Sequence, residues 1–349
     1  MTPDLLLPFA GTAPDFATPP LWCGRGSTVI GRTTLGAEAW LGDEAVIRGD
    51  GHDVIAGDRL WLGPRATLHI AQDMYPCILG DRVTVGPDAC VHACTVGDDC
   101  VIEDDVVVLD GTVIEDGVVV EAGSTVFPRT TLPTGLVCAG SPAVPVRRLE
   151  PGEAAARAAR LRERVFAPPP PGESGRDPGA SVFVARTARL RGAVTLEAGA
   201  SIFFGCDLAA GAGPIGVGAN ANVQDNCALH TAGAGLEIAR DTTLGHNVRA
   251  ADGRIGPRSL VGIGSRLAPG TVVEEDVMVA AGTVTQPGQV LESGWLWGGR
   301  PARPLARLDE GKREMMRRIV QQYAGYGRAY RKAQDRLETD RLGIDRPEP

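Results

Sequence analysis

Four of the five histidines in this chain lie in two segments about 160 residues apart, and they are the side chains best suited to chemistry. The earlier segment contains His69 and His92, and the later one contains His230 and His246. Neutral imidazole is the commonest metal ligand in proteins and also serves as a general base. These histidines are therefore the first candidates for a metal site or for acid–base catalysis.

Both segments lie within a six-residue sequence period. In the first half the period begins near Val29 and, after an interruption, resumes at Leu62 and runs to about Phe127; in the second half it restarts at Val184. A period of six fits neither a strand that alternates at two nor a helix that repeats at 3.6. It predicts a β-helix, in which each unit supplies a short strand and a turn while the aliphatic residues stack in the interior.

Helix-forming and proline-rich segments divide the chain. A helix is expected from Pro151, and a longer one from Glu310 to about Leu337. The spacing between corresponding histidines indicates an internal duplication. The predicted fold class is an all-β solenoid of two parallel β-helix domains, each followed by an α-helix. The predicted units are an N-terminal arm (1–21), a first β-helix with its helix (22–167), a Pro/Gly linker (168–180), a second β-helix with its long helix (181–340) and a tail (341–349).

The composition excludes some functions. A formal net charge of -8 argues against nucleic acid or an anionic membrane as the partner, and no apolar run approaches the roughly 20 residues that span a bilayer. A cytoplasmic location is expected, with the eight cysteines as reduced thiols. Cys90, Cys94 and Cys100 flank His92, but they follow the hexapeptide period and are interpreted as core-filling residues rather than zinc ligands.

Several motifs resemble those of the γ-class carbonic anhydrases, whose hexapeptide repeats form a left-handed β-helix with three units per coil. The resemblance covers about residues 22–150 and 181–332. Its motifs are RGD at Arg48–Asp50, NVQD at Asn222–Asp225 with a histidine five residues on, LGH ending at His246, HAC at His92–Cys94, the closing GxPA segments, and the spacing of Tyr323 and Tyr330.

The resemblance implies one catalytic divalent metal, with zinc expected and iron or cobalt as alternatives, bound by three histidines. In the family's trimers one β-helix supplies the first and third ligands and a neighbour supplies the second. Neither repeat of this chain has a complete set. The three ligand positions read His69, Pro87 and His92 in the first repeat, and His230, His246 and Ala251 in the second.

The losses in the two repeats are complementary. The first repeat retains the pair that one subunit would supply, and the second retains the histidine that a neighbour would supply. Juxtaposed repeats would therefore form one composite site from His69, His92 and His246, with His230 as a leftover and Pro87 and Ala251 as degenerate positions. The alternative is decay after duplication, which leaves each histidine as an interface side chain.

The resemblance also suggests roles for neighbouring residues. Gln224 and Asn222 would hydrogen-bond the hydroxide or the developing oxyanion. Arg48 and Asp50 would organise the interface between repeats. The family's best-known proton shuttle, a glutamate, has no counterpart here, and the candidates in its place are Asp73 and His52. The missing shuttle predicts weak activity or a different substrate.

The leading functional hypothesis is a metal-dependent hydratase or hydrolase, a carbonic anhydrase-like lyase. A His₃ metal lowers the pKa of bound water from about 15.7 toward about 7, giving a hydroxide that attacks carbon dioxide or another small electrophile. A homo-oligomer is expected. Two other hypotheses remain: a hexapeptide acyltransferase with His230 as general base beside acyl-coenzyme A, and a non-catalytic assembly scaffold.

Overall fold

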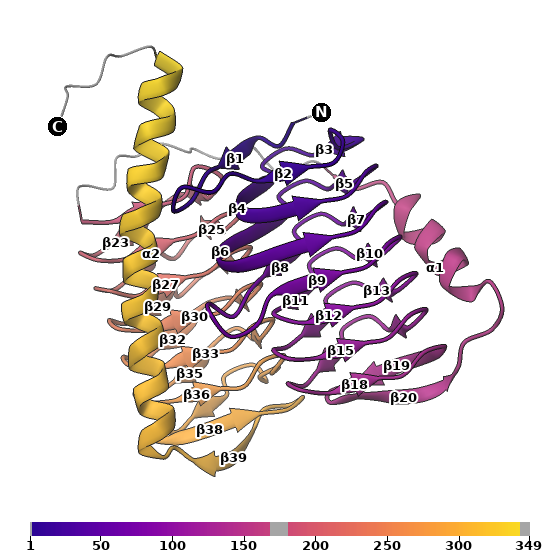
Figure 1. The fold of residues 1–349 in the computed structure, drawn as a ribbon. Helices are drawn as coiled ribbons and strands as arrows, with labels where there is room; N and C mark the ends of the chain where they lie inside the picture. The colour runs from indigo at the N-terminus through magenta and orange to yellow at the C-terminus, as the bar shows by residue number, and fades with distance from the viewer. Residues whose placement is uncertain (1, 168–180, 343–349) are drawn as a thin grey trace.

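Two parallel β-helices lie side by side in the computed structural model, which describes residues 2–167 and 181–342 (Figure 1). Helix α1 (Glu153–Arg162) follows the first β-helix, and helix α2 (Glu310–Leu342) follows the second. The fold class predicted from the six-residue period is therefore confirmed. Helix α2 contacts successive strands of the second β-helix and runs along its stacked coils (Figure 1).

One helix boundary differs from its prediction, and two predicted segments cannot be compared with the structure. Helix α2 begins at Glu310 as predicted but continues beyond Leu337. The predicted linker, 168–180, lies outside the described residues, as do residues 343–349 of the predicted tail.

The strands of the first domain form two sheets and pair in parallel from coil to coil, except the last two, Leu136–Gly140 and Ala143–Arg148, which pair antiparallel. The larger sheet contains β1 (Leu5–Leu7), β2 (Asp15–Phe16), β4 (Thr28–Leu35), β6 (Val46–Ala56), β8 (Thr67–His69), β9 (Cys77–Leu79), β11 (Cys90–His92), β12 (Thr95–Val96), β14 (Val107–Val108), β15 (Val113–Ile114), β17 (Thr125–Val126) and β18 (Thr131–Leu132). The smaller contains β3 (Trp22–Cys23), β5 (Trp40–Leu41), β7 (Trp61–Leu62), β10 (Thr84–Val85), β13 (Val101–Ile102), β16 (Val119–Val120), β19 (Leu136–Gly140) and β20 (Ala143–Arg148).

The second domain has three sheets, one on each side of the coil. The sheet under α2 contains β21 (Phe183–Val184), β24 (Ser201–Ile202), β27 (Asn222–Val223), β30 (Thr243–Leu244), β33 (Leu260–Val261), β36 (Met278–Val279), β38 (Trp295–Gly298) and β39 (Arg303–Arg307). The second contains β22 (Arg189–Arg191), β25 (Asp207–Ala210), β28 (Ala228–Thr231), β31 (Arg249–Ala250) and β34 (Arg266–Leu267). The third contains β23 (Val194–Leu196), β26 (Ile215–Val217), β29 (Leu236–Ile238), β32 (Gly253–Ile255), β35 (Thr271–Val273) and β37 (Val290–Leu291).

Aliphatic residues at equivalent positions of successive coils fill the interior. Val85, Ile102 and Val120 pair in register and are fully buried. The corners carry residues such as Asp88 and Asn247, at φ 58° and 55°, a left-handed conformation that Asp and Asn adopt more readily than most residues. Because parallel strands stack about 4.8 Å apart, a side chain lies above the equivalent side chain of the next coil. This stacking decides which polar residues share a face.

The N-terminal arm contacts both domains. Strand β1 pairs with β4 of the first domain, while Leu5 and Leu7 pack in the hydrophobic core of the second. The ring of Phe9 lies 4.7 Å from that of Tyr330 on α2, measured between centroids. The arm therefore helps to fix α2 against the junction of the domains.

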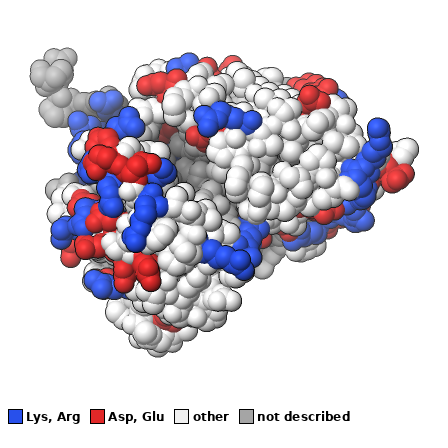
Figure 2. Space-filling view, turned by 90° about the horizontal axis from the view of Figure 1, so that it is seen from below, with Lys and Arg blue, Asp and Glu red and all other residues white. Residues whose placement is uncertain are grey.

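Corners of the second domain pack on a sheet face of the first. Asn226 donates a hydrogen bond to Thr67 Oγ1 at 3.0 Å, and Thr67 Oγ1 donates to Asn247 Oδ1 at 2.8 Å. Asn247 Nδ2 also donates to the backbone oxygen of Arg65 at 2.9 Å. Viewed from below, the surface shows two lobes with a hollow between them (Figure 2). The contact brings the turn that contains His246 against β8 and β11.

Two further features concern the cysteines near His92 and the two described helices. Cys90, Cys94 and Cys100 are buried free thiols, and none of them belongs to the histidine cluster described below. Across residues 2–167 and 181–342, neither helix combines the length and apolar character needed to cross a membrane.

Candidate metal centre

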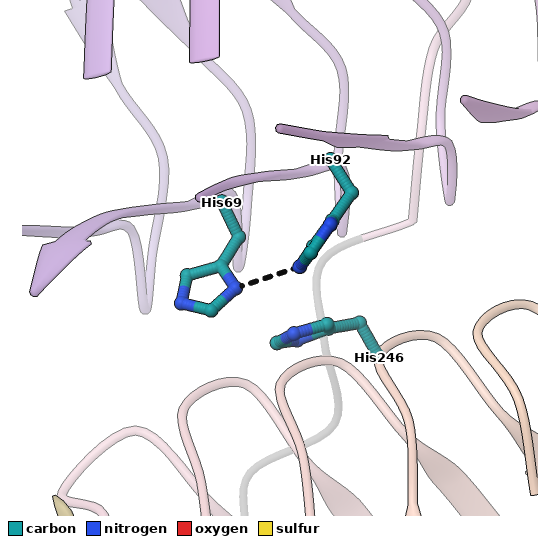
Figure 3. Close-up of side chains that lie close together, drawn as sticks. All are labelled: His69, His92 and His246. Carbon is teal, nitrogen blue, oxygen red and sulfur yellow. Dashed lines mark hydrogen bonds between the residues drawn. The ribbon is translucent and has the colours of Figure 1, made fainter. Parts of the chain in front are cut away.

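Three histidines from two domains meet at the junction (Figure 3). His69 and His92 end the adjacent strands β8 and β11 and pair in register, so their side chains point the same way. His246 follows β30 and reaches across from the second domain. His69 Nδ1 lies 3.2 Å from His92 Nε2, and one ring nitrogen from each histidine lies within 4.8 Å of the others. All three residues are buried.

Each clustered histidine is held by its own carboxylate. A carboxylate on one ring nitrogen orients the imidazole and leaves the other nitrogen free for a ligand. It also favours one tautomer at His92 and His246, whereas at His69 Nε2 the Arg48 guanidinium, a donor, faces the same nitrogen as Asp50. Such support accompanies metal-binding histidines in proteins. The pairs are His69 Nε2 with Asp50 Oδ1 at 3.0 Å, His92 Nδ1 with Asp110 Oδ1 at 2.6 Å, and His246 Nδ1 with Asp225 Oδ2 at 3.0 Å.

Arg48 joins the two domains beside the histidines. Its fully buried guanidinium lies 3.0 Å from Asp50 within the first domain and 2.8 Å from Asp225 of the second. It also lies 2.9 Å from His69 Nε2. Burial opposes the charge of Arg48, but the two carboxylates raise its pKa well above the ordinary value and keep it ionised.

Helix α2 adds two buried tyrosines to the centre. The hydroxyl of Tyr323 accepts a hydrogen bond from Arg48 at 3.2 Å and lies 3.3 Å from His246 Nε2. Tyr330 donates a hydrogen bond to Asp50 Oδ2 at 2.6 Å. The C-terminal helix is therefore part of the wall of the centre.

His69 and His246 are held in the neutral form. Burial lowers the pKa of His69 well below 6.5, and the positive charge of Arg48 lowers it further. Burial also lowers the pKa of His246 to about 4, although the hydrogen bond with Asp225 works in the opposite direction. Neutral imidazole is the form that binds a metal, so no proton has to leave these two rings at neutral pH.

The metal-free protein is expected to lose stability as the pH falls from about 6.5 toward about 4. In this range the unfolded chain protonates its histidines, whose ordinary pKa is about 6.5, whereas folded His69 and His246 stay neutral. The unfolded state therefore binds more protons, and unfolding is favoured. Urea denaturation of chelator-treated protein across this range measures the effect. His246→Gln should flatten the profile, and an unchanged slope in that variant would contradict the explanation.

Gln224 and Asn222 are buried but make their contacts away from the clustered histidines. Gln224 Nε2 donates to Asn222 Oδ1 at 3.3 Å, and Asn222 Nδ2 donates to Thr243 Oγ1 at 2.8 Å. Among the described residues, neither amide hydrogen-bonds a histidine of the cluster. The oxyanion role suggested for them stays a prediction.

The remaining candidates lie at other places. His52 is 30% exposed, and its Nδ1 accepts a hydrogen bond from the backbone of Asp53. Asp73 lies in an exposed loop. Pro87 is buried at a corner of the first domain. Ala251 and His230 line a separate cavity at the junction of the domains, and the His230 side chain is 56% exposed.

Asp110 and Asp225 were not singled out from the sequence as partners of histidines. Asp225 is the last residue of the NVQD motif, so the motif contained the signal. Asp110 follows His92 by 18 residues, which is three hexapeptides and hence one coil. That spacing could have identified it, although the same period places carboxylates at many corners.

Comparisons with known proteins agree with the fold and the motifs. The family model "Bacterial transferase hexapeptide (six repeats)" matches residues 93–128. Gamma carbonic anhydrase 1, mitochondrial, of Arabidopsis thaliana is 32% identical over 155 residues, or 42% of this chain and 56% of the relative. Gamma carbonic anhydrase 2, mitochondrial, of the same plant is 35% identical over 136 residues, or 37% of this chain and 49% of the relative. The chain thus spans about half the length of these two proteins.

Two further matches bear on the family and the fold. Carnitine operon protein CaiE of Escherichia coli is 30% identical over 149 residues, or 41% of this chain and 74% of the relative. A solved structure of an acetyltransferase from Desulfovibrio desulfuricans, described as putative, covers 87% of this chain and 77% of its own, with a TM-score of 0.56 and 14% identity, so it supports the fold alone. The chain therefore belongs to the hexapeptide-repeat β-helix family that includes the γ-class carbonic anhydrases.

Proposed function

We propose that His69, His92 and His246 bind one divalent metal ion, with zinc the best match, and that the centre hydrates or hydrolyses a small electrophile such as carbon dioxide. The observation that carries this proposal is the meeting of three carboxylate-supported histidines from two domains. At zinc–nitrogen distances of about 2.0–2.1 Å, tetrahedral geometry puts two ligand nitrogens about 3.3 Å apart. The 3.2 Å separation of His69 Nδ1 and His92 Nε2 fits that value.

His69, His92 and His246 would hold the divalent ion, which when bound would supply water with a pKa lowered toward about 7. The surrounding residues set what can react there. Since His69, His92 and His246 are 3%, 9% and 1% exposed, only a small substrate reaches the centre without rearrangement. Tyr323 places a hydroxyl beside His246 Nε2, where it can hydrogen-bond a reacting group. Asp110, with 37% of its side chain exposed, connects His92 to solvent.

Metal analysis and carbon dioxide hydration test this function. Protein stripped with a chelator and dialysed against zinc should retain one ion per chain by mass spectrometry. Stopped-flow hydration assays should then show activity that depends on the ion. Substoichiometric metal after reconstitution would contradict the metal centre. Full metal with no hydration would contradict carbon dioxide as the substrate and favour ester hydrolysis assays.

Asp110→Asn is expected to weaken metal binding by roughly 10–100-fold, the usual effect of removing a carboxylate that supports a ligating histidine. The reason is that the amide cannot accept a charge-assisted hydrogen bond from His92 Nδ1 as the carboxylate does. Competition with a chromogenic chelator measures the affinity. Asp110→Glu should recover part of it, and Asp99→Asn, at an exposed corner, should change nothing. Equal affinity in Asp110→Asn and the wild type would exclude the positioning role.

A further inference from the structure

A cavity of about 630 Å³ lies at the junction of the domains and is distinct from the histidine centre. Strands β25, β28, β31 and β34 form one wall, and turns of the first domain form the other. The described residues that line it include neither the three clustered histidines nor their carboxylate partners. The cavity is therefore a separate candidate binding site, and the proposed metal chemistry makes no use of it.

One end of the cavity holds an oriented but accessible histidine. His230 Nε2 lies 3.2 Å from Asp207 Oδ2, and Arg191 donates to both oxygens of Asp207 at 2.8 Å. Only 9% of the Asp207 side chain is exposed, compared with 56% of His230. The carboxylate is covered and fixes the ring, and the imidazole is the part that a ligand can reach.

Two arginines of this cavity are more accessible than two of its acidic residues. Arg249 and Arg266 are 36% and 45% exposed, whereas the acidic side chains Glu44 and Asp88 are 3% and 24% exposed. Arg249 pairs with Asp88 at 2.8 Å and with Asp105 at 3.0 Å, and Arg266 pairs with Asp105 at 2.7 Å, so the two guanidinium groups share two carboxylates. The numbers of acidic and basic residues in the lining are similar, but His230, Arg249 and Arg266 have larger exposed fractions than Glu44, Asp88 and Asp207, so a ligand can reach these three side chains more easily.

A buried donor points in the same direction. Arg189 lines the cavity, pairs with Glu44 and lies 3.7 Å from Asp207, and its side chain is 11% exposed. Its Nε–H is buried and has no acceptor in the part of the chain that the structure describes. Buried donors in folded proteins nearly always have a partner, so this N–H is one more donor that an acceptor group of a ligand could use.

The rest of the wall is apolar. Ala250, Ala251, Leu267, Ala268 and Val284 line it. Small and aliphatic side chains of this kind fit a short hydrocarbon body better than a sugar or a nucleotide, whose hydroxyl and phosphate groups need many polar partners.

We propose that this cavity binds a small organic carboxylate. The carboxylate group contacts His230, Arg249 and Arg266, and the short apolar body lies against Leu267 and Val284. Guanidinium groups bind a carboxylate through paired N–H donors, which suits a planar anion. Binding here does not depend on the metal centre.

Titration calorimetry with butyrate tests the site on the full chain. Butyrate should bind saturably with a dissociation constant on the order of 1 mM, because so small a ligand has few atoms with which to bind. His230→Ala and Arg266→Gln should each weaken binding about tenfold or more, as charged hydrogen bonds are lost. Ala251→Phe should abolish it by filling the cavity. Arg254→Gln, on the exposed sheet of β32, serves as the matched control and should bind as the wild type does.

The outcomes separate the site from the metal centre. His92→Ala should bind butyrate normally, so a failure of the metal proposal leaves this one standing. Butanol should not bind, because it lacks the anionic group. No saturable binding, unchanged binding in the three cavity variants, or inorganic phosphate binding more tightly than butyrate would each overturn the carboxylate assignment. Thermal melting of each variant confirms that it is folded before binding is compared.

Discussion

His92→Ala and His246→Ala are each expected to lose the bound metal ion and, with it, hydration activity. Each substitution leaves two imidazoles, one too few for a His₃ centre. The loss of affinity should exceed the roughly 10–100-fold effect of removing a supporting carboxylate, because a direct ligand is removed. Metal content after reconstitution and affinity by chelator competition measure the result. The two variants change different domains, so a common loss would show that both domains supply ligands.

His230→Ala is the matched control for these variants. It removes the remaining histidine of the hexapeptide segments, which lies in the other cavity against Asp207. This variant should keep full metal content. Metal retained in both His92→Ala and His246→Ala would disprove the composite centre, whereas metal lost from His230→Ala as well would indicate unspecific loss through unfolding. Circular dichroism and melting curves distinguish that case.

Asp225→Ala is expected to lower the free energy of unfolding by about 3–5 kcal/mol, the usual cost of removing one partner of a buried ion pair. Asp225 is fully buried and lies 2.8 Å from Arg48 and 3.0 Å from His246. Its removal leaves the guanidinium with Asp50 alone inside the protein. The pair also joins the two domains, so the junction should loosen. Urea denaturation of the metal-free protein measures the change.

A triple variant and a surface pair provide the controls. Arg48→Met combined with Asp225→Leu and Asp50→Asn removes the arginine and both carboxylates that pair with it, so it should be less destabilised than Asp225→Ala, since none of these three charges stays buried without its partner. Glu237→Ala breaks the exposed pair with Arg254, whose side chain is 58% accessible, and should cost less than about 1 kcal/mol. If Asp225→Ala were no more harmful than Glu237→Ala, the ion pair would not be a main support of the junction.

The repeating part of the fold could be predicted because its physical cause is local. Aliphatic residues such as Val85, Ile102 and Val120 recur once per coil, and burying them requires coils to stack in register. The same periodicity pairs His69 with His92 on adjacent strands. Asp110 follows from that rule too, one coil after His92, but corner carboxylates recur so often that periodicity alone does not single it out.

The N-terminal arm and the cavity were harder to read from the sequence. Leu5 and Leu7 belong to a segment with no period, and they are buried because another domain happens to cover them. His230 matches the family motif most closely among the histidines, yet it lies in a cavity with Asp207 rather than in the cluster. A sequence motif specifies a side chain and its local turn, but the residues that this side chain contacts depend on which other segment packs against it.

By itself, the sequence determined the β-helical fold, because the six-residue period converts directly into stacked coils. The resemblance to the γ-class carbonic anhydrases added the hypothesis that His69, His92 and His246 form one composite site across the two repeats. Only the tertiary structure decided that His246 lies within 4.8 Å of His69 and His92. That contact depends on how two rigid domains dock, through Asn247 at a corner and the buried ion pair of Arg48 with Asp225, and no periodic signal encodes a docking of this kind.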